Sequence, residues 1–197
     1  SITGQFSIVN PNFKYSEKSL FTNIESTATD RLSSNGYKSS KTGFSFGTSF
    51  EQYEDLYFSP NLNTYYEKIT TNATATSSLK KQEGNTFDMN FSYGLDYYKR
   101  NQRYMPSDGF RSSFSQSLPI ISENYTVSNS YEISGYNKLE NDMVTQLTFY
   151  TKVITALAEN KDVKISQRLS LPTNKLRGFE RGRVGPVDNG DYVGGNY

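Results

Sequence analysis

Hydrophobic and polar residues alternate with a period of two along most of the chain. The clearest stretch is residues 87–97, where aromatic and aliphatic side chains at odd positions are separated by polar or small residues such as Asp88 and Asp96. Successive side chains of a β-strand point to opposite faces, so this stretch would have one apolar and one polar face. On a helix the same residues would be scattered around the axis. The pattern therefore predicts a β-strand.

The same alternation recurs as far as about residue 157. It predicts eight strands, at residues 2–9, 18–28, 40–51, 55–67, 85–99, 109–118, 123–137 and 142–157. Several exceed the ~5–6 residues of common globular strands and reach the ~9–11 residues that cross a bilayer. A ninth run, residues 163–171, alternates more weakly.

The connections between these strands differ in length. Four are compact, and three of them contain turn-forming residues: 10–12, 52–54, 103–109 and the stretch around Lys138. Those near 29–39 and 68–84 are longer and polar, and residues 158–197, dense in glycine and charge, are expected to form one long loop. Short turns at one end of the strands and longer loops at the other are typical of outer-membrane barrels.

Alternation alone leaves open a membrane barrel and a soluble β-sandwich. Composition favours the barrel, because the chain has 16 Tyr and 13 Phe despite a mean hydropathy of −0.71. Aromatic residues form the girdles of such barrels, and a disordered chain would be poor in them. In a barrel, one alternating set is expected to face lipid: Phe6, Phe44, Phe46, Phe87, Phe91, Phe114 and Phe149.

The residue types present restrict the possible chemistry. The chain contains no Cys, His or Trp. This excludes Cys–His and Ser–His–Asp catalysis and zinc sites built on Cys or His. An enzyme is the class we expect least, and we expect neither cofactor nor metal. The net charge of +1 gives no electrostatic argument for a nucleic-acid partner.

Short motifs near the C-terminus resemble a long loop of one known family. They are Leu176-Arg177-Gly178-Phe179, Val184-Gly185-Pro186 and Gly194-Gly195-Asn196. In this order they resemble the sixth extracellular loop of BamA-type outer-membrane protein assembly factors, which carries Val where this chain has Leu176. Residues 9–13 and 103–109 resemble periplasmic turns of the same family. In the second turn, Pro106, Asp108 and Gly109 are expected to build a tight turn with Gly109 at positive φ.

The resemblance covers residues 1–197 and implies a transmembrane, antiparallel, up-and-down β-barrel. The eight strands would correspond to strands 4 to 11 of a barrel of about 16 strands, and residues 158–197 to most of loop six. POTRA domains and the remaining strands would lie outside this chain.

In the family, this loop folds into the barrel lumen. The resemblance therefore implies that residues 172–186 cover the concave, polar face and that Arg177 points inward to a carboxylate, which its guanidinium can grip bidentately. Gly178 would permit close packing or positive φ. Phe179 would anchor the loop, and the carboxylate partners are expected beyond Tyr197. A solvated loop arginine is the alternative for Arg177.

The function implied is the folding and insertion of outer-membrane proteins, in the bacterial outer membrane. Expected partners are outer-membrane lipid, unfolded outer-membrane protein clients and accessory lipoproteins bound through POTRA domains. A polypeptide-translocating pore of the two-partner secretion type is the alternative within the superfamily. A soluble β-sandwich binding module is a third hypothesis.

Overall fold

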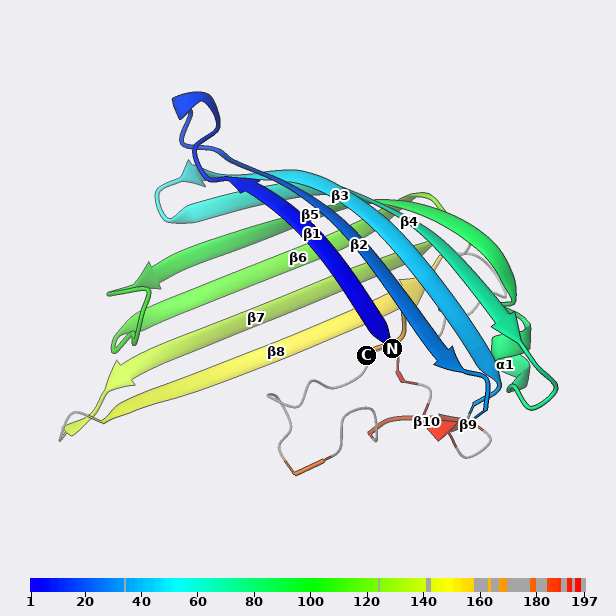
Figure 1. The fold of residues 1–197 in the computed structure, drawn as a ribbon. Coiled ribbons are helices and arrows are strands. Elements are labelled where there is room, and N and C mark those ends of the chain that lie inside the picture. Colours follow the sequence, from blue (N-terminus) through cyan, green and yellow to red (C-terminus); the bar gives the residue numbers. More distant parts are fainter. Residues whose placement is uncertain are drawn as a thin grey trace.

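One antiparallel sheet contains eight consecutive strands, each paired with its neighbours in sequence. The computed structural model describes residues 1–33, 35–123, 125–140, 143–157, 163, 167–169, 178–179, 184–188, 191–192 and 194–195. The strands are β1 (Ile2–Asn10), β2 (Ser19–Arg31), β3 (Tyr37–Tyr53), β4 (Leu56–Thr71), β5 (Gly84–Arg100), β6 (Gly109–Ile121), β7 (Thr126–Lys138) and β8 (Val144–Ala156). The sheet is an arch, open between β1 and β8 (Figure 1). The predicted antiparallel meander is confirmed.

The strands of the β3–β4 hairpin are longer than the sequence pattern predicted. Their ladder continues to the pair Tyr37↔Thr71, through the polar residues Lys38 and Lys68. Ladder hydrogen bonds join backbone groups and do not require apolar side chains. The alternation therefore marks the apolar part of each strand and misses its polar extension.

The connections show only part of the predicted contrast in length. At one end lie residues 11–18, with the short helix η1 (Phe13–Tyr15), and then 54–55, 101–108 and 139–143. At the other end lie 32–36, 72–83 and 122–125. The connection 72–83 is long, as expected, but 122–125 is shorter than 101–108 at the opposite end.

The connection 72–83 contains a helix that sequence reasoning missed, α1 (Ser77–Lys80). The Thr76 hydroxyl caps it by accepting a hydrogen bond from the Leu79 backbone N–H at 3.3 Å. Ala75 and Leu79 are buried. A single helical turn is too short for hydrophobic periodicity to reveal, so tertiary burial decides it. No helix in the described ranges is long and apolar enough to cross a membrane.

The convex face carries the apolar set. Phe6, Ile24 and Phe44 are partners across β1, β2 and β3. All seven phenylalanines expected to face lipid lie on this face, and five of them are 45–63% exposed: Phe6, Phe44, Phe46, Phe87 and Phe149. Phe91 and Phe114 are half-buried, each with its ring centroid 6.2 Å from that of Tyr93. These side chains do not converge on a closed core, as a β-sandwich would require.

The concave face carries the polar set, whose side chains hydrogen-bond to one another. Asn63 Nδ2 donates to Asn61 Oδ1 at 2.5 Å and to Ser92 Oγ at 3.2 Å. Ser92 Oγ in turn donates to Ser117 Oγ at 2.9 Å. A polar chain therefore crosses β4, β5 and β6, and it satisfies groups that would otherwise depend on water.

Two glycines of β3 make room for aromatic rings on this concave face. A Cβ atom at Gly43 would lie 2.7 Å from Cδ1 of Tyr65, and one at Gly47 would lie 2.5 Å from Cζ of Phe21. Both rings belong to neighbouring strands, so each covers a strand glycine. Lys41 Nζ lies 4.2 Å from the centroid of the Tyr65 ring.

Candidate functional site

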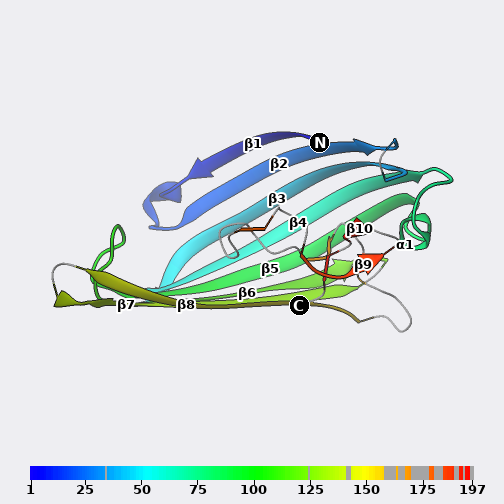
Figure 2. The same ribbon diagram turned by 90° about the horizontal axis from the view of Figure 1, so that it is seen from below.

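The C-terminal segment contacts the concave face at β7. Thr126 Oγ1 donates a hydrogen bond to Gln167 Oε1 at 3.0 Å. Thr126 lies on the same face of β7 as Ser128 and Ser134, the polar face. The small hairpin of β9 (Val187–Asp188) and β10 (Asp191–Tyr192) also lies on the concave side of the sheet (Figures 1 and 2).

Gly194 and Gly195 of the Gly-Gly-Asn motif meet Leu169. Leu169 N donates to Gly195 O at 2.8 Å, and Gly195 N donates to Leu169 O at 2.9 Å. Gly194 has a φ of +76°, and a Cβ atom there would lie 2.9 Å from Leu169 O. The motif therefore needs glycine for both backbone conformation and close approach. Of the weakly predicted ninth strand, residues 163–171, the structure describes Val163, which is buried, and residues 167–169 around this bridge.

The other residues of the loop motif are only partly described. Leu176, Arg177 and Asn196 lie outside the described residues, as does most of 172–186. Gly178 and Gly185 have φ values of +87° and +129°, and a Cβ atom at either would meet nothing within 4 Å. Glycine is therefore favoured at both positions by the positive φ and not by a lack of space for a side chain. Phe179 is 57% exposed, Pro186 is also exposed, and the anchoring role of Phe179 stays a prediction.

The turn 101–108 is organised by Asn101, a residue that sequence reasoning did not single out. Asn101 Oδ1 accepts hydrogen bonds from the backbone N–H groups of Ser107 at 3.2 Å and Asp108 at 3.3 Å. Asn101 Nδ2 donates to Ser107 Oγ at 2.8 Å. The signal in the sequence was an Asn directly after a strand, a common turn residue.

Gly109 closes this turn and begins β6. Its φ is +88°, and a Cβ atom there would lie 2.0 Å from the carbonyl oxygen of Lys99. Pro106 is half-buried and Asp108 exposed. The turn thus depends sterically on Gly109. Asp108 contributes its backbone carbonyl oxygen, which accepts a hydrogen bond from Asn101 N at 3.2 Å.

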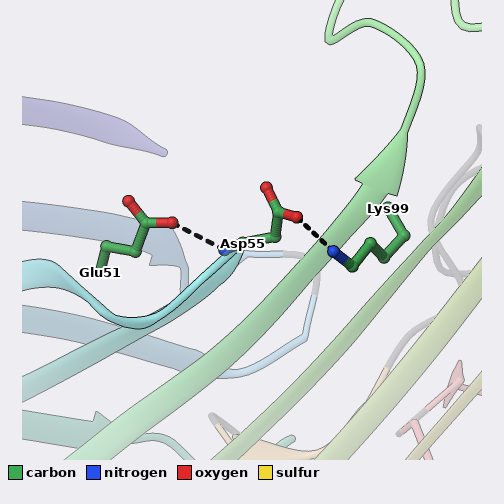
Figure 3. Close-up of polar contacts among 3 residues, drawn as sticks. All are labelled: Glu51, Asp55 and Lys99. Atoms are coloured by element: carbon green, nitrogen blue, oxygen red, sulfur yellow. Dashed lines mark hydrogen bonds and ion pairs between the residues drawn. The ribbon is translucent and has the colours of Figure 1, made fainter.

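The adjacent turn, residues 54–55, is joined to β5 by side chains (Figure 3). Asp55 has a φ of +63°, and its N–H donates to Glu51 Oε1 at 2.7 Å. Lys99 Nζ donates to Asp55 Oδ2 at 2.6 Å. Tyr98 N also donates to the Asp55 carbonyl oxygen at 2.9 Å. Asp55 therefore links the β3–β4 turn to β5.

At the same end of the sheet, the concave face carries an arginine–tyrosine cluster. Its members are Arg100, Arg103, Arg111, Tyr57, Tyr98 and Tyr136. The Cζ atoms of the three arginines lie 5.2–5.3 Å from the centroid of the Tyr98 ring. Tyr57 packs edge-on against Tyr98, with ring centroids 5.6 Å apart.

One carboxylate joins the cluster through an ion pair. Arg111 Nη2 lies 2.7 Å from Asp96 Oδ1, and both side chains are partly buried. The sequence pattern placed Asp96 on the polar face, where the structure has it. It did not reveal the three arginines as a group, because Arg111 meets Tyr98 only through the β5–β6 register. That register depends on the length of the turn 101–108.

The described residues contain no group of three His, Cys, Asp or Glu that could hold a metal ion. An open cavity of about 300 Å³ lies on the concave face below α1, and Lys41, Glu67 and Leu79 are among its lining residues. The arrangement is suited to binding and to supporting a barrel wall.

Comparison with known proteins identifies the fold. A family model described as the Omp85 superfamily domain matches residues 1–197. No curated protein sequence matches. Among solved structures, the crystal structure of BamA from Haemophilus ducreyi lacking POTRA domains 1–3 matches with a TM-score of 0.80 and 23% sequence identity. The match covers 98% of this chain but 42% of that one, so the chain spans less than half of its structural relative. Matched by the family model from end to end and folded like part of the BamA barrel, this chain belongs to the Omp85 superfamily.

Proposed function

We propose that this chain is the central part of an outer-membrane β-barrel that folds and inserts other outer-membrane proteins. The observation that carries the proposal is a BamA-like sheet with opposite chemistry on its two faces. The convex face exposes Phe44, Phe87 and Phe149, and the concave face carries the hydrogen-bonded polar chain through Asn63. An apolar exterior and a polar interior are what a membrane barrel requires.

The backbone pairing of the sheet supports a membrane location. Each strand from β2 to β7 is paired on both sides. Inside a bilayer every backbone polar group needs a protein partner, so only helices and closed barrels span it. The outer edges of β1 and β8 would meet the flanking strands of a longer barrel, such as the one in the Haemophilus ducreyi structure.

The partners proposed follow from this assignment. Outer-membrane lipid would contact the convex face, and unfolded outer-membrane proteins would be the clients. Accessory lipoproteins would bind through POTRA domains outside this chain. Folding and insertion of a client would require no covalent step.

A polypeptide-translocating pore of the two-partner secretion type is the second candidate. The polar chain across β4, β5 and β6 favours it, because a hydrated, hydrogen-bonded wall can line a channel. The two candidate functions differ in the final location of the client protein. An assembly factor leaves its client in the membrane, whereas a translocating pore releases it on the far side.

Reconstitution of the full-length protein tests both candidates. Liposomes with and without the protein would receive a urea-denatured barrel protein, and its folding would be followed by the gel-mobility shift of unheated samples. We expect faster folding in the liposomes that contain the protein. Unchanged folding, together with uptake of the client into a protease-protected liposome interior, would support the pore instead.

A further inference from the structure

The arginine–tyrosine cluster has more hydrogen-bond donors than its neighbours accept. Arg111 donates to Asp96 at 2.7 Å and Arg103 donates to the Tyr57 hydroxyl at 3.1 Å. Arg100 makes no side-chain hydrogen bond within the part of the chain that the structure describes. The Nε atoms of Arg100 and Arg111 are buried without a partner there. Each guanidinium has five N–H donors, and a buried donor without an acceptor costs free energy.

Tyrosine rings hold the three guanidinium groups close together. Arg100 Cζ lies 5.3 Å from the Tyr98 ring centroid and 5.9 Å from that of Tyr136. Arg103 Cζ lies 5.4 Å from the Tyr57 ring and 5.3 Å from the Tyr98 ring. Stacking on aromatic faces stabilises arginine and restricts its side chain. A ligand would therefore meet donors that are already in place.

The local charge is positive. Arg111 interacts with the carboxylates of Asp96 and Glu132. Three guanidinium groups against these two carboxylates leave one positive charge in excess. The cluster lies on the concave face, beside the turns 54–55 and 101–108, so lipid that covers the convex face does not reach it.

We propose that this cluster binds a carboxylate of a polypeptide segment that approaches the concave face at the turn end of β5 and β6. Arg100 and Arg103 would supply the free donors, and their planar forks match a carboxylate in a bidentate geometry. The tyrosine rings would contact the apolar part of the same segment. The inference deepens the proposed function, on which it rests, by naming the chemistry through which a client would be held.

Peptide binding to the full-length protein in detergent micelles tests the proposal. The probes are a fluorescein-labelled peptide of alternating glutamate and serine and its glutamine counterpart, followed by fluorescence anisotropy. We expect the glutamate peptide to bind more tightly. Arg100→Gln and Arg103→Gln should each weaken its binding about tenfold, the scale of a charged hydrogen bond. Added salt should weaken it further, because exposed charges are screened.

Two matched variants separate this site from a general charge effect. Lys41→Gln removes a cation beside Tyr65 on the concave face at the other end of the strands. Lys99→Gln removes a cation next to Arg100 but on the opposite face of β5. Both should leave binding of the glutamate peptide unchanged. An equal loss of binding in these controls would overturn the proposal.

Peptide binding by the wild-type protein tests carboxylate recognition even if an arginine variant does not fold. Equal affinity for the glutamate and glutamine peptides would refute carboxylate recognition. Discrimination between the peptides without any acceleration of client folding would leave the cluster as a carboxylate site and reject the assembly function. Normal acceleration without discrimination would reject the cluster and leave the assembly function standing.

Discussion

Arg111 Nη2 lies 2.7 Å from Asp96 Oδ1, which joins β6 to β5 on the concave face of the sheet. Asp96 is diagonal to Arg111, whose direct partner in the register is Tyr98. The ion pair therefore fixes the relative position of two strands and also orients Arg111 toward the Tyr98 ring. Its loss should affect both stability and the arginine–tyrosine cluster.

Arg111→Gln should lower the free energy of unfolding by about 1 kcal/mol. The pair is only partly buried, so solvent screening limits its contribution, but Asp96 would be left without its cation. Urea unfolding followed by circular dichroism measures the change. Lys38→Gln is the control, because Lys38 and Asp30 are 3.9 Å apart with exposed side chains. An equal effect of the two substitutions would show that burial of the Arg111 pair adds nothing.

Gly109→Ala should destabilise the protein by about 2–4 kcal/mol. The φ of +88° strains any side chain, and the new Cβ atom would lie 2.0 Å from Lys99 O, so the turn must open. Gly135→Ala is the matched change in β7, where a Cβ atom meets nothing within 4 Å. Heat-modifiability on gels compares the two. Wild-type melting of Gly109→Ala would contradict the turn geometry.

Phe91→Arg should cost about 2–4 kcal/mol if the convex face lies in the bilayer near its midplane. Phe91 is close to the middle of β5, and its neighbours on that face are Tyr93, Leu62 and Leu118. Ser115→Arg places the same charge on the exposed, concave face and should be tolerated. Folding yield into lipid vesicles measures both. Equal tolerance of the two arginines would argue against a lipid-facing convex surface.

Arg177→Ala in the complete protein should lower barrel stability or assembly activity. The reasoning rests on the family resemblance of the loop: an inward arginine would leave its carboxylate partner unpaired, at a cost of about 1–3 kcal/mol. Arg177→Lys should restore function only in part, since an ammonium group cannot form the same fork. Growth complementation and heat-modifiability are the measurements. If Arg177→Ala behaves as wild type in both assays, Arg177 is an ordinary solvated loop residue.

The sequence by itself determined the apolar part of each of the eight strands, their antiparallel order and the chemistry of the two faces. Alternation such as that from Phe87 to Tyr97 is a local property, because each residue's face follows from its position in the strand. Short connections then required neighbouring strands to pair. The glycine motifs near 178 and 194 were recognised by their resemblance to a family loop, and the positive φ values of Gly178 and Gly109 agree with what was expected of those glycines.

Only the tertiary structure decided which side chains on a face meet. Arg100, Arg103 and Arg111 gather around Tyr98 because the β5–β6 register and the turn organised by Asn101 bring them together. The pairing of Leu169 with Gly195 joins segments that no local pattern connects. A shift of one residue in register would keep the alternation within each strand but change every cross-strand partner. Alternation therefore specifies faces, whereas binding clusters depend on turn geometry and long-range pairing.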